Sequence, residues 1–266
     1  MMQAETPVAA LGKLGLHDHA TDFAAIREQF PALHQSVHEK PLVYLDSAAT
    51  TLKPQAVIDA VSHVYAVDCA NIHRGVHVLS QRATEAYEAV RDKVKSWVHP
   101  PKDSHVIFVR GTTEAINLVA DAYVLPRIGQ GDEIVITELE HHSNIVPWQL
   151  VTERTGATLV VVPMTDAGEI TLDAFEATLS SRTKFVALAH VSNALGTVLP
   201  VKSLIEIAHA KGIPVLLDGA QAVSHVPVNI ADLDADFYAL SAHKLYGPTG
   251  TGVLVAKTSL DRKSVV

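Results

Sequence analysis

The sequence predicts an α/β protein in which a mostly parallel β-sheet carries helices on both faces. Eight short apolar runs rich in β-branched residues recur along the chain, and apolar residues within them do not alternate with polar ones. This pattern is typical of strands that are buried on both faces of a parallel sheet. Segments with the three- and four-residue spacing of helices lie between the runs, and this repeated order of strand and helix is typical of α/β folds.

The predicted elements follow in chain order. We expect strands at Leu42–Leu45, Val106–Val109, Glu133–Thr137, Thr158–Val162, Phe185–Ala189, Pro214–Leu217, Phe237–Leu240 and Gly252–Val255. Helical spacing is clearest from Ala83 to Trp97 and from Leu204 to Ala208. We expect the second of these helices to stop at Lys211-Gly212, because glycine readily takes the left-handed conformation that ends a helix.

Composition excludes several classes of protein. The 266 residues are 48% apolar, which is enough for a large core and too apolar for a disordered chain. A formal net charge of −8 argues against a general nucleic-acid binder, which needs a clustered basic surface. No apolar run is long enough to span a bilayer, and the N-terminus lacks the features of a signal or transit peptide. We therefore expect a soluble cytoplasmic protein with no membrane partner.

The chain contains one cysteine, Cys69, which excludes an internal disulfide and a zinc site built from several thiolates. A reducing compartment is consistent with this count. Cys69 falls at the end of the helix-like run Val57–Cys69, so we interpret it as a buried, unreactive thiol rather than a nucleophile.

Polar residues follow several predicted strands, at the edge where α/β sheets bind their ligands. The segment Arg110-Gly111-Thr112-Thr113-Glu114 comes after Val106–Val109 and opens a helical run. Its glycine turn, hydroxyls and free helix N–H groups suit a phosphate. Taken alone, an ordinary threonine N-cap is the simpler interpretation. No glycine fingerprint of a dinucleotide or nucleoside triphosphate site follows any strand.

Two further strand ends carry ambiguous signals. His141 and His142 follow Glu133–Thr137, but neighbouring side chains in an extended segment point in opposite directions and cannot easily share one metal ion. We therefore expect one imidazole to face the site, the other to face the structure, and no metal. Asn193 follows Phe185–Ala189 and offers both a donor and an acceptor, although a turn residue before a glycine is an equally good interpretation.

The strongest pair is an acid and an amine at successive strand ends. Asp218 directly follows Pro214–Leu217, and Lys244 follows Phe237–Leu240. A lone lysine beside a turn is usually a solvated surface residue. At a buried strand end, however, desolvation lowers the lysine pKa, and a neutral amine can attack a carbonyl to form a Schiff base. An amine, an acid and a phosphate-type turn together match the requirements of pyridoxal phosphate.

Seven motifs, in this order, resemble those of the SUF-type (group II) cysteine desulfurases, which belong to the class V aminotransferase superfamily. They are Tyr44–Thr51, His73–His77, Arg110–Glu114, Glu140–Asn144, His190–Asn193, Asp218–Gln221 and Ser241–Gly250. The match runs from about Phe23 to Lys257, nearly the whole chain, and the last two motifs are highly specific. The resemblance implies the large domain of the pyridoxal-phosphate transferase fold type I, with a mostly parallel seven-stranded sheet.

The resemblance also implies an activity and a domain organisation. The implied enzyme is a homodimeric transferase that uses pyridoxal 5'-phosphate, converts L-cysteine to L-alanine and mobilises the sulfur as an enzyme-bound persulfide. A sulfur-acceptor protein of iron–sulfur cluster assembly would receive that sulfur. Residues 1–20 would be a flexible extension and residues 21–266 the cofactor-binding large domain, with residues 21–45 contributing to a small domain.

Carried over motif by motif, the resemblance implies a role for each candidate residue. Lys244 would bind the cofactor covalently and shuttle the substrate's α-proton, and Asp218 would keep the cofactor's ring nitrogen protonated. The remaining implied roles are hydrogen bonding to the phenolic oxygen (Gln221), ring stacking and acid–base work (His141), cofactor phosphate binding (Thr112, Thr113, Ser241, His243) and substrate contact (Asn193, also near the phenolic oxygen, and His73).

One part of the family pattern is missing. In the family, a cysteine on a mobile loop carries the persulfide and an arginine binds the substrate carboxylate, and both belong to a C-terminal region that has no match here. We therefore expect a truncated chain, inactive if no other chain supplies these groups. The alternatives are a selenocysteine lyase, another class V aminotransferase-like enzyme, or a non-catalytic protein of the same fold that pairs with another chain.

Overall fold

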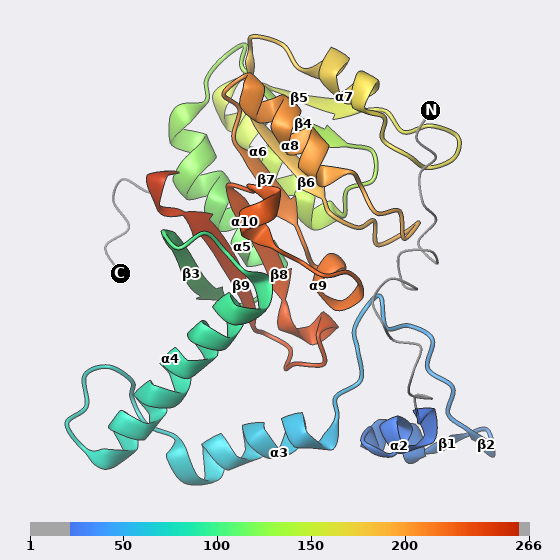
Figure 1. Ribbon diagram of the computed structural model, residues 1–266, viewed down its shortest axis with the longest axis vertical. Helices are drawn as coiled ribbons and strands as arrows, with labels where there is room; N and C mark the ends of the chain where they lie inside the picture. The colour runs from blue at the N-terminus through green and yellow to red at the C-terminus, as the bar shows by residue number, and fades with distance from the viewer. Residues whose placement is uncertain (1–21, 261–266) are drawn as a thin grey trace.

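The structure, a computed structural model, describes residues 22–260, so the predicted flexible extension 1–20 lies outside the described residues. A seven-stranded sheet forms the centre of the body (Figure 1). From one edge to the other it consists of β3 (Ser104–Val109), β9 (Gly252–Lys257), β8 (Phe237–Ser241), β7 (Val215–Asp218), β6 (Thr183–Ala189), β4 (Glu133–Thr137) and β5 (Thr158–Val162). Only β9 runs against its neighbours within this sheet, so the predicted mostly parallel sheet is confirmed.

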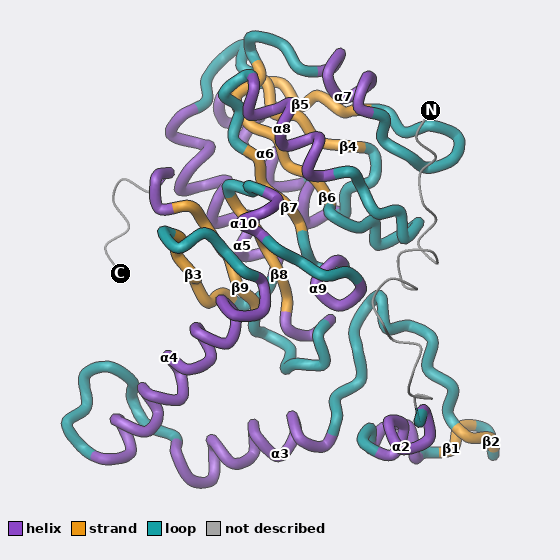
Figure 2. Tube along the Cα trace, in the orientation of Figure 1, coloured by secondary structure: helices purple, strands orange, loops and turns teal. Residues whose placement is uncertain are grey.

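Helices cover both faces of the sheet (Figures 1 and 2). They are α5 (Thr112–Val119) and α6 (Val146–Thr155) on one face, and α7 (Leu172–Thr178), α8 (Val201–Ala210), α9 (Ala222–His225) and α10 (Ile230–Leu233) on the other. Alternate residues of one strand enter the two apolar layers: in β4, Val135 packs with the α8 side and Ile134 with the α5 side. Burial on both faces explains why the strand sequences are apolar without alternation.

Seven of the eight predicted strands are present, and the prediction of the first one is wrong. Leu42–Leu45 forms no strand; the nearest strands are the two-residue β1 (Ser36–Val37) and β2 (Lys40–Pro41), which pair only with each other. Val43 and Leu45 are 73% and 92% exposed. An apolar run becomes a strand only where a neighbouring strand takes up its backbone hydrogen bonds, and none does so here.

The predicted helices are present with longer bounds. Helix α4 spans Val78–Val98 and includes the spacing from Ala83 to Trp97, and α8 ends where predicted, with Gly212 in the left-handed region at φ 70°. Short 3₁₀ or π turns occur at Pro31–His34, Val64–Asp68, Ala120–Val124, Leu125–Arg127, His142–Asn144, Ala242–Lys244 and Thr258–Leu260, and α2 spans Phe23–Glu28. Within residues 22–260, no helix combines the length and the apolar character that crossing a bilayer requires.

An arm projects from the body at the bottom of Figure 1. It consists of α3 (Gln55–His63), the π turn that follows it and the first half of α4. Cys69 lies directly after the π turn and is exposed, so the interpretation of a buried thiol is wrong. The helical periodicity of this run was read correctly, but no residue of α3 is buried, because the helix packs on no part of the body.

Candidate active site

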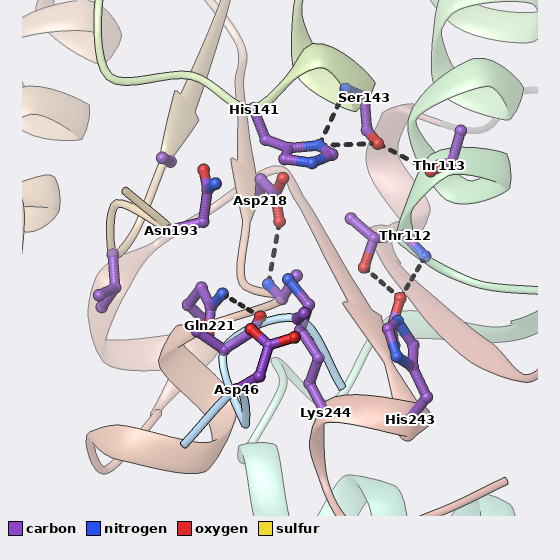
Figure 3. A pocket seen from close by; sticks show the side chains of 16 residues that line it. Asp46, Thr112, Thr113, His141, Ser143, Asn193, Asp218, Gln221, His243 and Lys244 are labelled. Carbon is purple, nitrogen blue, oxygen red and sulfur yellow. Dashed lines mark hydrogen bonds between the residues drawn. The ribbon is translucent and has the colours of Figure 1, made fainter. Parts of the chain in front are cut away.

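A cavity of about 450 Å³, lined by many polar side chains, lies at the carboxyl ends of β4, β6, β7 and β8. Figure 3 shows these side chains converging from the separate strand ends. Nine of the ten candidate residues predicted from sequence line this cavity: Thr112, Thr113, His141, Asn193, Asp218, Gln221, Ser241, His243 and Lys244. They meet because parallel strands all end at the same edge of a sheet, as expected for ligand sites in α/β folds.

Asp218 and Lys244 provide the opposite charges of this cavity. Asp218 is the last residue of β7 and is only 7% exposed, and Lys244 is half-buried in the 3₁₀ turn that follows β8. Burial raises the pKa of Asp218, and this rise is opposed by the Ala220 N–H bonded to its Oδ1 at 2.9 Å and by the nearby Lys244 ammonium. Burial lowers the pKa of Lys244, opposed by the Asp218 carboxylate. Burial therefore makes the amine less basic and the carboxyl less acidic than on the surface, and the charge of each group opposes part of the shift in the other.

A glycine directly after Asp218 lets the chain turn close to the sheet. A Cβ on Gly219 would lie 2.1 Å from the Tyr238 ring, which is fully buried on β8. The Tyr238 hydroxyl is 3.0 Å from Nδ1 of the buried His190, whose pKa burial lowers to about 4. The neutral side chains of His190 and Tyr238 thus support the turn after Asp218 without placing a charge next to its carboxylate.

The hydroxyl cluster at the start of α5 lies beside Lys244. Ser241 Oγ accepts the Thr112 N–H at 2.7 Å and lies 2.7 Å from Thr112 Oγ1. The N-cap of α5 is Gly111 at φ 155° and ψ 177°, which has no side chain, and the bond to the Thr112 N–H comes from Ser241 instead. The alternative of a threonine N-cap is therefore wrong: the two threonines are the first residues inside the helix. Their hydroxyls and the helix N-terminus line the cavity, an arrangement suited to an anion.

The Lys244 turn is held by a segment from the other end of the chain. The carbonyl of His243 accepts hydrogen bonds from the Thr51 N–H at 3.0 Å, the Thr51 hydroxyl at 2.9 Å and the Lys53 ammonium at 2.9 Å. Gln221 Nε2 donates to the carbonyl of Ala48 at 2.7 Å. This segment, residues 46–53, is called the strap below. Its Asp46, Ala48 and Ala49 line the cavity, and sequence reasoning missed them, although their motif was part of the resemblance.

His141 faces the cavity and His142 does not. Nδ1 of His141 accepts the Ser143 N–H at 3.1 Å, so the proton of the neutral imidazole lies on Nε2. His142 is exposed, so the expectation that it would face the structure is wrong. The two rings are 6.0 Å apart at 78° to each other, and residues 22–260 contain no cluster of three His, Cys, Asp or Glu side chains suited to a metal ion.

His73, the tenth candidate, does not line this cavity. It lies on the arm between α3 and α4, where its Nε2 is 3.7 Å from Glu88 and its ring contacts Tyr87 edge-on at 5.6 Å. Its backbone is in the left-handed region at φ 67°. Since the arm extends away from the body, His73 does not reach the cavity of its own chain. Its role in substrate contact stays a prediction, and it would require the cavity of a second chain.

Glu140 is a buried acid next to the cavity that sequence reasoning did not single out. Burial raises its pKa to about 7, although hydrogen bonds from Thr137, Ala189 and Asn144 oppose the rise. Between the ordinary value of 4.5 and about 7, the folded protein holds a proton that the unfolded chain has released, so the free energy of unfolding falls as the pH rises.

We expect this proton to make the stability of the wild-type protein fall relative to Glu140→Gln as the pH rises through that window. The expected loss is about 3 kcal/mol, at about 1.4 kcal/mol per pKa unit. Chemical denaturation of both proteins at a series of pH values measures the difference. A difference that stays constant with pH would show that Glu140 titrates normally.

The chain is similar to known proteins in sequence and in fold. The model of the aminotransferase class-V family matches residues 43–264. A probable cysteine desulfurase of Mycolicibacterium paratuberculosis is 56% identical over 233 residues, which are 88% of this chain and 34% of that protein. A probable cysteine desulfurase of Vibrio cholerae is 53% identical over 236 residues, 89% of this chain and 58% of that one.

Two solved structures are similar in fold. The cysteine desulfurase CsdA of Escherichia coli superimposes with a TM-score of 0.81 at 42% identity, covering 91% of this chain and 59% of that one. The apo cysteine desulfurase of Thermococcus onnurineus gives a TM-score of 0.83 at 36% identity, covering 91% and 58%. The chain thus spans between about one third and three fifths of the length of these four relatives.

Proposed function

Because this chain belongs to the aminotransferase class-V family, we propose that it acts as a pyridoxal-phosphate-dependent cysteine desulfurase, which converts L-cysteine to L-alanine and mobilises the sulfur. Members of this family depend on pyridoxal phosphate. The observation that carries the proposal is the convergence of Lys244 and Asp218 on one cavity beside the hydroxyls at the start of α5. The cofactor needs an amine for its aldehyde, an acid for its ring nitrogen and a phosphate site, and the cavity offers all three.

In the proposed site, the chain's own residues bind and orient. The Lys244 amine binds the cofactor aldehyde, and Asp218 holds a proton on the ring nitrogen. Thr112, Thr113, Ser241 and His243 bind the phosphate. When bound, the cofactor supplies a ring that withdraws electrons from the substrate's α-carbon. A buried acid is suited to this task, because its charge interacts more strongly with the ring nitrogen in a site that excludes water than it would on the surface.

The other lining residues orient the ring and move protons. His141 stands at the cavity with its ring proton on Nε2, where it can donate to a substrate atom. Gln221 lies between the strap and the cavity and would donate its second amide hydrogen to the ring's phenolic oxygen. Asn193 would contact the phenolic oxygen and the substrate carboxylate. Lys244 would move the substrate's α-proton.

The proposal extends to the assembly and its location. We place the protein in the cytoplasm as a homodimer whose sulfur passes to an acceptor protein of iron–sulfur cluster assembly. Support for self-association comes from the arm, where Tyr65 is 76% and Val76 96% exposed. Exposed apolar groups of this kind commonly mark sites of protein association.

We expect Tyr65→Ser combined with Val76→Ser to shift the protein from dimer toward monomer, because both changes remove apolar surface that association would bury. Size-exclusion chromatography with light scattering measures the mass. The control is Leu150→Ser on α6, which removes an apolar side chain that is 49% exposed but lies on the body. Equal masses for the arm variant and the control would contradict an arm-mediated dimer.

The test of the activity is the conversion of L-cysteine to L-alanine by the purified chain loaded with pyridoxal phosphate. Dithiothreitol serves as the thiol acceptor: its S–H sulfur takes the substrate's sulfur as a persulfide, and the substrate carbon gains the hydrogen. The second thiol of dithiothreitol then displaces sulfide from this persulfide and closes a cyclic disulfide, so alanine and sulfide should appear in equal amounts. Loading of the cofactor without alanine would favour a non-catalytic protein of this fold, and a strong preference for selenocysteine would favour a selenocysteine lyase.

A further inference from the structure

Glu140 forms a buried hydrogen-bonded network at the edge of the sheet. The residue is 9% exposed, and its carboxylate accepts three hydrogen bonds. Oε1 accepts the Thr137 hydroxyl at 2.6 Å and the Ala189 N–H at 2.9 Å, and Oε2 accepts an amide hydrogen of Asn144 at 2.6 Å. Thr137 ends β4, Ala189 ends β6 and Asn144 ends the 3₁₀ turn before α6. One side chain thus joins two strand ends to the turn between them.

The network continues into the core through Asn144. The Asn144 side-chain oxygen accepts the indole N–H of the fully buried Trp148 at 3.0 Å, while its amide nitrogen donates to Glu140. A carboxylate only accepts hydrogen bonds, so it satisfies all of these donors at once. A glutamine at position 140 would direct an N–H₂ group at the Asn144 amide nitrogen or at the Thr137 and Ala189 donors, and one bond would be lost.

His141 lies between the two ends of this network. Glu140 precedes it, and the Asn144 N–H donates to the carbonyl of His141 at 2.7 Å. Within the turn, the Ser143 hydroxyl is 3.0 Å from His141 Nδ1 and 2.8 Å from the Thr113 hydroxyl. The backbone on both sides of the imidazole is therefore fixed by Glu140, directly on one side and through Asn144 on the other.

We propose that Glu140 is a positioning residue, whose buried carboxylate holds the His141 imidazole at the cavity by joining the ends of β4 and β6 to the 3₁₀ turn His142–Asn144. Only its catalytic consequence rests on the proposed function; the placement of the imidazole does not. Removing a carboxylate from water is costly, and an apolar side chain of similar size would fill the same space without that cost. The geometry that the carboxylate imposes accounts for its presence at this position.

The chain offers a matched control for this acid. Glu133 begins β4, at the opposite end of the strand, and is also buried. It accepts hydrogen bonds from the Ser180 hydroxyl at 2.5 Å and from the Arg182 guanidinium at 2.6 Å. Glu133→Gln therefore removes a buried, hydrogen-bonded charge at the far end of β4 without touching the His141 turn.

The first readout needs neither cofactor nor turnover. Histidine signals are recorded by NMR in isotope-labelled protein above neutral pH, and the His141 signal is assigned from its absence in His141→Ala. We expect Glu140→Gln to shift the His141 signal, and Glu133→Gln to leave it in place. Trp97→Phe leaves Trp148 as the sole tryptophan, so its fluorescence reports in parallel whether the Asn144 bond survives. An unshifted His141 signal in folded Glu140→Gln would overturn the proposal.

The second readout is a double-mutant cycle in alanine formation. We expect Glu140→Gln to lower kcat by about tenfold to a hundredfold, the usual cost of a misplaced catalytic group. In a His141→Ala background, the same change should cost less than about twofold, because a residue acting through His141 has nothing left to position. Equal costs in both backgrounds would show that Glu140 acts independently of His141. A chain that makes no alanine contradicts the proposed function, and the NMR readout then decides on Glu140 alone.

Folding of each variant is checked by circular dichroism. If Glu140→Gln does not fold, Asn144→Ala replaces it, because that change leaves the Thr137 and Ala189 bonds of the carboxylate intact. A smaller shift of the His141 signal is then expected, and none would overturn the proposal.

Discussion

Replacing Lys244 with alanine is expected to remove the visible absorbance band of the bound cofactor and to lower alanine formation by roughly a hundred- to ten-thousandfold. The amine at this position lies in a cavity that lowers its pKa by burial, so a reactive neutral form is available there. No substitute amine is close by in the strap, since the Lys53 ammonium is engaged by the carbonyls of Thr51 and His243 at 2.6 and 2.9 Å.

Titration of the purified protein with pyridoxal phosphate, followed by its visible spectrum, measures this effect. Lys202→Ala is the control, because Lys202 is exposed on α8 and pairs only with Asp232 in the described structure. If the absorbance band is the same in Lys244→Ala as in the Lys202→Ala control, Lys244 does not have its proposed role. The cavity would then contain no amine for the aldehyde.

Replacing Asp218 with asparagine is expected to separate activity from stability. Burial raises the pKa of this acid, so its ionised form is costly in the folded protein without cofactor. Asparagine carries no charge and can still accept the Ala220 N–H through its side-chain oxygen. We therefore expect the variant to unfold at the same temperature or a higher one, with an advantage that grows as the pH rises above the range in which an unfolded aspartate ionises.

The activity of Asp218→Asn should change in the opposite direction. A neutral amide cannot hold a proton on the ring nitrogen electrostatically, and the loss of a buried charge of this kind costs on the order of a hundred- to a thousandfold in rate. Thermal unfolding without cofactor and alanine formation with it are the two measurements. Asp232→Asn, which changes an exposed acid, should alter neither. Full alanine formation by Asp218→Asn would contradict the assignment.

Most of the sheet could be predicted from the sequence, because strands buried on both faces are apolar without alternation. Glu133–Thr137 and Thr158–Val162 have the predicted bounds, and the other five differ by one or two residues at an end. The direction of β9 could not be predicted, since an apolar run such as Gly252–Val255 reads alike in parallel and antiparallel pairing. The exposed Leu42–Leu45 shows the limit of the method: apolar content predicts burial only where other elements cover the segment.

The candidate site was predictable to the extent that its residues follow strands. Asp218 comes directly after one buried run and Lys244 four residues after the next, and parallel strands bring the ends of these runs to one edge of the sheet. Glu140 also follows a strand, but its role depends on three donors from separate elements, which no local pattern reveals. The position of Cys69 was misjudged for the same reason: the spacing of its helix is visible in the sequence, but the arm's separation from the body is not.

The strap has a consequence for how the protein is made. Thr51 and its partner His243 are 192 residues apart, and their hydrogen bonds hold the turn that carries Lys244. During synthesis, the strap leaves the ribosome long before the turn that it must hold. The hydrogen bonds between the strap and this turn can therefore form only after translation has passed Lys244, so the cavity is completed late in synthesis.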